Sequence, residues 1–364
     1  MENLRIPGPT PCPDEVLQAM TKQMINHRGP EFKQIIYGIT DKLKQLFQTK
    51  GDVFLLTASG TGGMEAAVVN TLSPGDEVLS VAIGVFGERF GVIAEKFGAE
   101  VIPLRFEWGK AADIDTIRKA LQDKPGIKAV LVTHNETSTG VTNDLGSISS
   151  VAKEFDKLLL VDAISSLGSI NLPVDDWRCD VTVTGSQKGW MTPPGLAMVS
   201  VSQKAWQAHS KAKMPRFYWD FTKAKNYLEK GQTPWTPGVS TVYALSIALD
   251  MVQKEGFANI IARHTRVAQT ARDGIKSLGL SLFAQESHAS NTVTSVAASN
   301  GLDTKKLLKI MREEHQVVLG GGQQKLDGKI FRIGHLGRVN DDDIATVISA
   351  LKVALPQAGF RSKS

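Results

Sequence analysis

Residues 158–189 read LLLVDAISSLGSINLPVDDWRCDVTVTGSQKG, and this stretch holds two short apolar runs that each lead into polar residues. The runs 158–161 and 181–184 consist of Leu, Val and Thr, a composition that is typical of buried strands. Asp162 follows the first run, and Lys188 follows the second. Ligands of open α/β sheets bind beyond the carboxyl ends of the strands, so both side chains are candidates for a binding site. Taken alone, Asp162 could equally well cap the segment that follows it, and a solvated surface position is the commoner role of an isolated lysine.

The same alternation of apolar runs and helical patterns extends to both sides of this stretch. Further strands are predicted at 53–57, 77–82, 101–104, 128–133 and 197–201. Helices are predicted at 64–72, 87–97, 115–122 and 147–155. Strands that alternate with helices indicate a largely parallel sheet with helices on both faces. The sequence therefore predicts an α/β domain.

A second, smaller unit is predicted at the C-terminal end. A polar, Pro-rich stretch at 231–238 precedes a long helical pattern that begins near Val242. After residue 255 the patterns predict a helix, a strand at 292–298, a helix at 303–314, a strand at 329–333 and a final helix at 341–354. We expect an N-terminal arm at 1–20, a large domain at 21–254 and a small α+β domain at 255–364.

The composition is that of an ordinary globular protein. Of the 364 residues, 42% are hydrophobic and 22% are charged, so the chain can bury a large core. It contains no apolar run of about 18 residues and no apolar segment near its start, so we expect neither a transmembrane helix nor a signal peptide. The 42 basic residues exceed the 37 acidic ones without forming a dense block, so we expect them to be scattered over solvated faces rather than to bind nucleic acids, although the net charge would suit small anionic ligands.

Cysteine and histidine usage argues against disulfides and metal binding. The two cysteines, Cys12 and Cys179, form neither a disulfide framework nor a zinc-ligand spacing. The 7 histidines include no H-x-x-x-H pair. We therefore expect no metal site and a reducing, cytoplasmic location.

The run Ser59-Gly60-Thr61-Gly62-Gly63 stands between a predicted strand and a predicted helix. Its small residues would let backbone N–H groups and a hydroxyl approach a phosphate at the helix N-terminus, where the helix dipole favours negative charge. The run matches neither G-x-G-x-x-G nor the Walker A pattern, and a plain tight turn explains it equally well.

Three features together point to one cofactor. A phosphate cradle, the carboxylate of Asp162 and the amine of Lys188, all at strand ends of one sheet, match the needs of pyridoxal phosphate. Its aldehyde reacts with a lysine, its pyridinium nitrogen pairs with a carboxylate, and its phosphate binds a helix N-terminus. The ring of Phe86 is a candidate for stacking on the pyridine, and core packing is the ordinary alternative role.

Six motifs make the chain similar to a known family. They are PGPT at 7–10, SGTGG at 59–63, HNETSTG at 134–140, VDA at 161–163, GSQK at 185–188 and FRIG at 331–334. With these motifs, which span nearly the whole chain, the sequence resembles the class V aminotransferases of fold type I, particularly the alanine–glyoxylate and serine–pyruvate group. The resemblance implies a pyridoxal phosphate enzyme with a seven-stranded, mostly parallel sheet in its large domain.

The resemblance also implies a role for each matching residue. Lys188 would bind the cofactor aldehyde covalently, Asp162 would pair with the pyridinium nitrogen, and Arg332 would grip the substrate carboxylate. The remaining cofactor contacts would come from Thr61, Gly62, Gly63 and Gln187 at the phosphate, from Phe86, Thr137 and Ile164 at the ring, and from Thr233 and Thr236 of the second subunit in a homodimer. Phe86 stands where relatives often have Trp, and Thr233 stands where a Tyr can occur.

The implied activity is a ping-pong transfer of an amino group from alanine or serine to glyoxylate or pyruvate. The sequence does not separate these donors and acceptors. A 2-aminoethylphosphonate–pyruvate aminotransferase shares the same lysine, aspartate and arginine and remains the alternative. A lyase of the cysteine desulfurase kind needs a mobile cysteine near the domain boundary, whereas Cys12 is near the N-terminus and Cys179 directly precedes a buried strand. A binding protein without activity would be expected to have lost Lys188 or Asp162, and both are present.

Overall fold

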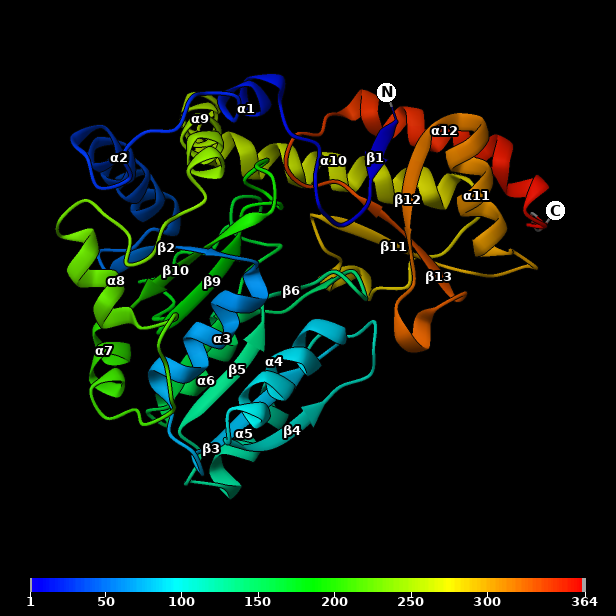
Figure 1. Cartoon of the computed structure of the whole chain (residues 1–364). Coiled ribbons are helices and arrows are strands. Elements are labelled where there is room, and N and C mark those ends of the chain that lie inside the picture. Colours follow the sequence, from blue (N-terminus) through cyan, green and yellow to red (C-terminus); the bar gives the residue numbers. More distant parts are fainter. Residues whose placement is uncertain (1, 362–364) are drawn as a thin grey trace.

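A seven-stranded sheet lies at the centre of the larger part of the computed structural model, which describes residues 2–361 (Figure 1). Its strands are ordered β2 (Asp52–Ala58), β10 (Gly195–Val201), β9 (Val181–Gly185), β8 (Leu158–Asp162), β5 (Ala129–Thr133), β3 (Glu77–Ala82) and β4 (Glu100–Arg105). β10 runs antiparallel to both of its neighbours, and the other pairs are parallel. The predicted seven-stranded, mostly parallel sheet is therefore confirmed.

Helices cover both faces of this sheet. One face packs against α2 (Pro30–Phe47), α5 (Ile114–Asp123), α6 (Leu145–Glu154) and α9 (Val239–Glu255). The other face packs against α3 (Gly60–Thr71), α4 (Val85–Lys96), α7 (Gln203–His209) and α8 (Phe221–Leu228). Because both faces are covered, β5 and β8 are buried at every residue, which explains their continuous apolar sequences.

α3 begins at Gly60, four residues before the expected start at Met64. The apolar periodicity detects only the first large side chain, whereas the turn before it is helical because its residues are small. At Gly63 a Cβ atom would lie 2.5 Å from Cγ1 of Val183 in β9. Glycine therefore lets this first turn approach the sheet closely, at the end where Asp162 and Lys188 also lie.

A four-stranded sheet forms the other part of the molecule. Its order is β1 (Asn3–Arg5), β12 (Val317–Gly321), β13 (Ile330–Gly334) and β11 (Val293–Ala297), with β1 parallel to β12. α10 (Phe257–Ser277), α11 (Thr304–His315) and α12 (Asp341–Gln357) pack together with this sheet in one apolar cluster. The expected elements after residue 255 are present, but the sequence pattern misses β12, because its two glycines weaken the strand signal.

The N-terminal segment connects the two parts. β1 belongs to the second sheet, and Figure 1 shows it beside β12. Farther along, α1 (Asp14–Ala19) packs on α9 of the larger part. The expected arm at 1–20 thus begins as a strand of the C-terminal sheet, and the boundaries expected after residues 20 and 254 stay predictions.

A small hairpin after β5 also contacts the segment that leads into β11 of the second sheet. It consists of β6 (Asn135–Glu136) and β7 (Val141–Thr142). Val141 forms a β-bridge with Ala289, and the Ser290 N–H donates to the Gly140 carbonyl at 2.8 Å. Short 3₁₀ helices lie at Glu286–His288 and Gln324–Leu326. The hairpin therefore places residues 135–142 between the two sheets.

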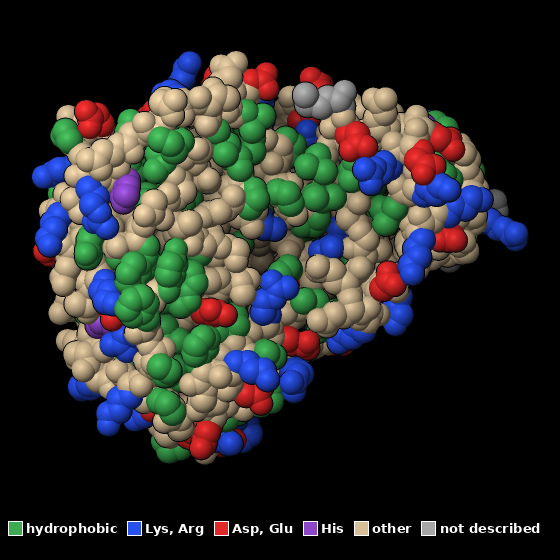
Figure 2. Space-filling model, viewed as in Figure 1, with side chains coloured by type: hydrophobic (Ala, Val, Ile, Leu, Met, Phe, Trp, Pro, Cys, Tyr) green, Lys and Arg blue, Asp and Glu red, His purple; other side chains and the backbone are tan. Residues whose placement is uncertain are grey.

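The surface carries basic and acidic side chains in a mixed arrangement. Figure 2 shows this on the face seen in Figure 1, which is hollowed near its centre. Among residues 2–361, no helix is long and apolar enough to cross a membrane.

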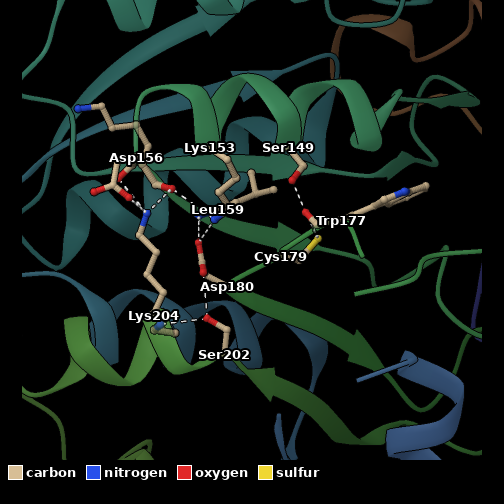
Figure 3. Close-up of polar contacts among 11 residues, drawn as sticks. Ser149, Lys153, Asp156, Leu159, Trp177, Cys179, Asp180, Ser202 and Lys204 are labelled. Atoms are coloured by element: carbon tan, nitrogen blue, oxygen red, sulfur yellow. Dashed lines mark hydrogen bonds and ion pairs between the residues drawn. The ribbon is translucent and has the colours of Figure 1, made fainter. Parts of the chain in front are cut away.

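A buried ion pair ties α6 to the sheet at the amino ends of β8 and β9 (Figure 3). Lys153 of α6 pairs with Asp180, and the two side chains are 9% and 4% exposed. The Asp180 carboxylate also accepts hydrogen bonds from the Leu159 N–H at 2.8 Å and from the Ser202 hydroxyl at 2.9 Å. Desolvation lowers the pKa of the Lys153 amine, and the charge of Asp180 opposes that shift. This cluster lies at the end of the sheet opposite Asp162 and serves packing.

Candidate active site

A pocket of about 120 Å³ lies at the carboxyl ends of β8 and β9. It is lined by Ser59, Gly60, Thr61, Phe86, Arg89, Asn135, Thr137, Asp162, Ile164, Ser165, Gln187 and Lys188. The predicted site residues brought together here are Thr61, Phe86, Thr137, Asp162, Ile164, Gln187 and Lys188. The predicted residues that do not line the pocket are Gly62, Gly63, Thr233, Thr236 and Arg332.

Lys188 follows β9 and points at the N-terminal segment. Its Nζ donates a hydrogen bond to the Pro7 carbonyl. Gly8 has a φ of +118°, which side chains rarely adopt, so glycine is favoured where the segment passes Lys188, and a Cβ atom there would lie 2.5 Å from this Nζ. Desolvation lowers the pKa of the Lys188 amine to about 8, while the charge of Asp162 opposes the shift and that of Arg332 adds to it. An amine with this pKa has a useful neutral fraction near neutral pH and can act as a nucleophile.

Asp162 ends β8 and is 3% exposed. Its carboxylate accepts hydrogen bonds from the Ile164 N–H at 2.9 Å and the Thr133 hydroxyl at 3.2 Å, which are both neutral donors. Desolvation raises the pKa of Asp162 to about 6, against the effect of these hydrogen bonds and of the Lys188 charge. A buried carboxylate of this kind gains most from a cationic partner, and a protonated pyridinium nitrogen is such a partner.

The N-terminus of α3 opens on the same pocket. The first N–H groups of a helix have no intrahelical acceptor, so those of Gly60, Thr61 and Gly62 are free of helical bonding and can bind a phosphate. The N–H of Gly63, a predicted phosphate contact, donates to the Ser59 carbonyl at 3.3 Å. Gly60, which the sequence analysis did not assign to the phosphate, lines the pocket instead.

Gln187 gives a direct indication of a bound group. Its Oε1 is buried and has no hydrogen-bond partner within residues 2–361. Buried polar atoms in proteins are nearly always paired, so this orphaned acceptor marks a place beside the pocket where a donor is lacking. The NH₂ group of the same amide is the part that could donate to a phosphate. Together, the orphaned amide, the helix N-terminus, the buried carboxylate of Asp162 and the amine of Lys188 fit pyridoxal phosphate.

Phe86 and Arg89 stand one turn apart at the start of α4, and both line the pocket. The Arg89 guanidinium lies 4.8 Å from the centroid of the Phe86 ring. The positive charge of Arg89 opposes the rise in the pKa of Asp162 and adds to the lowering of the pKa of Lys188, in each case behind the larger effect of desolvation. The aromatic face expected beside the cofactor ring is thus accompanied by a cation.

Arg332 of β13 is hydrogen-bonded to Thr137, which lines the pocket. Its Nε donates to the Gly321 carbonyl at 2.8 Å, and its Nη1 donates to the Thr137 carbonyl at 3.0 Å. Desolvation lowers the pKa of the guanidinium to about 10, and the charge of Glu136 opposes this shift. Two carbonyls therefore fix the plane of a buried cation at the edge of the pocket.

Thr233 and Thr236 lie away from the pocket. The Thr233 hydroxyl donates to the Trp235 carbonyl at 2.7 Å, and Thr233 lines a separate small cavity with Trp235 and Tyr218. Within one chain these hydroxyls are therefore not placed to contact a cofactor bound at Lys188.

Sequence reasoning missed Arg89, Asn135 and Ser165 as pocket residues. Arg89 is three residues after Phe86 on a helix, a spacing that puts both on one face. Asn135 lies inside the HNETSTG motif, and its amide donates to the Ser165 hydroxyl at 2.8 Å and to the Thr292 hydroxyl at 2.9 Å. The helical spacing could have identified Arg89, whereas the contacts of Asn135 depend on tertiary structure.

No metal centre accompanies these residues. In the described part of the chain, no group of three or more His, Cys, Asp or Glu side chains is placed to hold a metal ion. Cys12 and Cys179 are both free cysteines.

Comparisons with known proteins agree with the geometry of the pocket. Residues 3–330 match the sequence profile of the family Aminotransferase class-V. The soluble hydrogenase 42 kDa subunit of Anabaena cylindrica is 45% identical over 362 residues, which cover 99% of this chain and 94% of that protein. The serine–glyoxylate aminotransferase of Methylorubrum extorquens is 36% identical over 370 residues, covering 99% and 92%.

A solved structure extends this likeness to the fold. Alanine–glyoxylate aminotransferase from Nostoc sp. superposes with a TM-score of 0.94 at 30% sequence identity, covering 97% of this chain and 95% of that one. The profile spans most of the chain, and the sheet topology and pocket are those expected for it. The chain therefore belongs to the class V aminotransferase family and is a pyridoxal phosphate-dependent aminotransferase of fold type I.

Proposed function

We propose that this aminotransferase moves the amino group of alanine or serine to glyoxylate or pyruvate in a two-stage, ping-pong reaction. The observation that carries the proposal is the meeting of Lys188, Asp162 and the N-terminus of α3 in one pocket. The substrate class is supported by the relatives named for serine with glyoxylate and for alanine with glyoxylate. The name of the Anabaena relative points elsewhere, and the proposal follows the family profile and the pocket.

Each part of the cofactor has a matching group in the chain. When bound, pyridoxal phosphate supplies the carbonyl that takes up the amino group and the ring that accepts electrons from the substrate Cα. The carboxylate of Asp162 would hold positive charge on the ring nitrogen. The N–H groups at the start of α3 and the side-chain NH₂ group of Gln187 would hold the phosphate, and Phe86 would cover one face of the ring.

Lys188 would move the proton of the reaction. Its amine, with a pKa lowered to about 8, can accept a proton from the substrate Cα and release it again near neutral pH. The hydrogen bond from Nζ to the Pro7 carbonyl limits the directions in which the amine can point. In the second stage the same amine returns the proton to Cα of the 2-oxo acid substrate.

Arg332 would bind the α-carboxylate that every proposed donor and acceptor carries. Its Nη2 has no hydrogen-bond acceptor among residues 2–361, while Nε and Nη1 are held by the Gly321 and Thr137 carbonyls. A guanidinium fixed on one side presents its remaining donors in one orientation, which suits a carboxylate.

The enzyme would act as a homodimer. Phe217 and Tyr218 are 68% and 42% exposed, and both stack on Trp235, with ring centroids 4.9 and 5.7 Å apart. Figure 2 shows hydrophobic side chains gathered near α8 on this face. Exposed aromatic clusters of this kind mark interaction surfaces. Since Trp235 lies between Thr233 and Thr236, a second copy that covers the cluster would bring these hydroxyls toward its own phosphate site.

We also propose that the enzyme works in the cytoplasm. Its two cysteines, Cys12 and Cys179, are free, as is usual in a reducing compartment. Separation of cell fractions, with the activity followed in each, tests this location.

The half-reaction with single amino acids tests the proposed substrates. We expect the visible absorbance of the cofactor-loaded enzyme to bleach rapidly with L-alanine or L-serine and to persist with 2-aminoethylphosphonate. Lys188→Ala is the control and should bleach with none of them. Bleaching by 2-aminoethylphosphonate alone would favour the phosphonate enzyme, and no bleaching with any amine would contradict the proposal.

A further inference from the structure

Glu136 is fully buried beside the pocket, and the proposed reaction does not use it. Its carboxylate accepts four hydrogen bonds. Oε2 accepts from the N–H groups of Phe86 and Gly87, each at 3.0 Å. Oε1 accepts from the N–H of Ser138 at 3.2 Å and from its hydroxyl at 2.5 Å. All four partners are donors, so the carboxylate is fully committed to this arrangement.

The first pair of hydrogen bonds holds the start of α4. The N–H groups of Phe86 and Gly87 lie in the first helical turn, where no intrahelical acceptor exists, and the N-cap residue Gly84 has no side chain to supply one. Glu136 supplies the missing acceptor from β6, and its negative charge suits a helix N-terminus. A Cβ atom at Gly84 would lie 2.5 Å from Cγ of Glu136, which shows how closely the two segments pack. The contact therefore fixes the backbone that carries the Phe86 ring.

The second link runs to Arg332. The Thr137 carbonyl, which accepts a hydrogen bond from Arg332 Nη1 at 3.0 Å, belongs to the residue that follows Glu136. The Glu136 charge also opposes the lowering of the pKa of this guanidinium by burial. Consequently, Glu136, which caps α4, also fixes the neighbouring peptide group whose carbonyl accepts the hydrogen bond from Arg332.

We propose that Glu136 is a positioning residue. It holds Phe86 and Arg332 at fixed positions relative to each other, on the two sides of the bound substrate. This inference rests on the proposed function, which assigns the cofactor ring to Phe86 and the substrate carboxylate to Arg332. Glutamine has the same shape but cannot replace it, because an amide NH₂ group would face N–H donors in place of one carboxylate oxygen. If these positions changed, stacking of Phe86 on the cofactor ring and binding of the substrate carboxylate by Arg332 would be weakened together.

Glu136→Gln in the cofactor-loaded enzyme tests this assignment. We expect KM for both the amino donor and the 2-oxo acid to rise about tenfold or more, because small displacements of binding groups have large kinetic effects. The visible circular dichroism of the cofactor, which reports the orientation of its ring, should weaken in the same variant. If Glu136→Gln does not fold, Glu136→Asp keeps the charge with a shorter reach and should shift both readouts in the same direction.

Asp113→Ala is the matched control for loss of a helix cap. The Asp113 carboxylate accepts from the Thr116 N–H at 2.8 Å at the start of α5 and does not line the pocket. We expect this variant to lose stability without changing KM or the circular dichroism signal.

A double variant separates positioning from general loosening. Arg332→Lys alone should raise KM, and adding Glu136→Gln should raise it by a smaller factor than in the wild-type background, because part of the Glu136 effect passes through the Arg332 contact. Unchanged KM and circular dichroism in Glu136→Gln would overturn the inference, as would full additivity with Arg332→Lys. A wild-type enzyme that bleaches with no amino donor would instead contradict the proposed function, and the circular dichroism of Glu136→Gln would still test the contact to Phe86.

Discussion

Lys188 owes its reactivity near neutral pH to burial. Desolvation lowers the pKa of its amine to about 8, although the carboxylate of Asp162 acts in the opposite direction. Only the neutral amine attacks an aldehyde, so the rate of cofactor capture by the apoenzyme should rise about tenfold per pH unit below this pKa and level off above it. Stopped-flow absorbance over a pH series measures this profile.

The variant Asp162→Asn tests the direction in which the Asp162 charge shifts the pH profile of cofactor capture. The negative charge of Asp162 stabilises the ammonium form, so its removal should move the midpoint of the profile to lower pH. Asp123→Asn, which removes an exposed carboxylate on α5, should leave the midpoint in place. A midpoint that moves upward in Asp162→Asn would contradict this electrostatic description.

At the residue level, the sequence predicts side chains that stand at the ends of strong strand signals. Asp162 ends one buried apolar run and Lys188 comes three residues after another, which is why their place at the carboxyl end of the sheet could be predicted from the sequence. Glu136 carries no such signal. Its importance arises from contacts with Phe86 and Gly87 of a helix that begins about fifty residues earlier in the chain, and no local pattern records such a pairing.

At the scale of elements, the Lys153–Asp180 ion pair fastens α6 to the sheet. Lys153→Met would leave the Asp180 carboxylate buried without its cation, so we expect a loss of about 3–5 kcal/mol in the free energy of unfolding. Lys119→Met is the control, because the Lys119–Asp123 pair is exposed and should contribute less than about 1 kcal/mol. Urea denaturation measures the free energy of unfolding of both variants. Equal losses of this free energy would show that the buried pair stabilises the protein no more than the exposed pair does.

The close approach of α3 to the sheet makes a second prediction at this scale. Gly63→Ala would place a Cβ atom 2.5 Å from Val183 and 3.2 Å from Ala197, so we expect a loss of about 1–3 kcal/mol and weaker cofactor binding. Gly38→Ala in α2 meets nothing within 4 Å and should stabilise the helix by about 0.5–1 kcal/mol. Thermal unfolding and cofactor titration distinguish the two variants. Unchanged stability and cofactor affinity in Gly63→Ala would show that α3 can shift freely against the sheet.

How well a strand or helix can be predicted from the sequence depends on whether it buries large side chains. β5 and β8 are buried on both faces and appear in the sequence as unbroken apolar runs. The first turn of α3 and strand β12 contain glycines that neighbouring segments approach closely, Val183 at Gly63 and Pro7 at Gly320. Local sequence therefore predicts the elements that bury large side chains and misses those shaped by close backbone approach.

On the scale of the whole molecule, the N-terminal segment was the feature least visible in the sequence. β1 pairs with β12 from the other end of the chain, and the residues after it pass Lys188. Three residues give too short a pattern to predict a strand, and their partner is remote in sequence. The overall order of a large sheet followed by a smaller α+β unit was predictable, because each half shows its own alternation of strands and helices.

The proposed homodimer links cofactor retention to assembly. Thr233→Val combined with Thr236→Val should weaken cofactor binding, although neither residue lines the pocket of its own chain. Thr346→Val on the exposed face of α12 is the control and should retain the cofactor. Equilibrium dialysis and analytical ultracentrifugation test both; a fully active, cofactor-loaded monomer would contradict the shared site.

Borohydride reduction of the cofactor-loaded enzyme, followed by peptide mass spectrometry, tests the assignment of Lys188 most directly. Reduction makes the bond between cofactor and lysine permanent, so the modified residue can be read from the peptide mass. We expect one modified peptide, containing Lys188, and no modification of Lys188→Ala. A cofactor adduct on any other lysine of the wild-type enzyme would contradict the active site described for this chain.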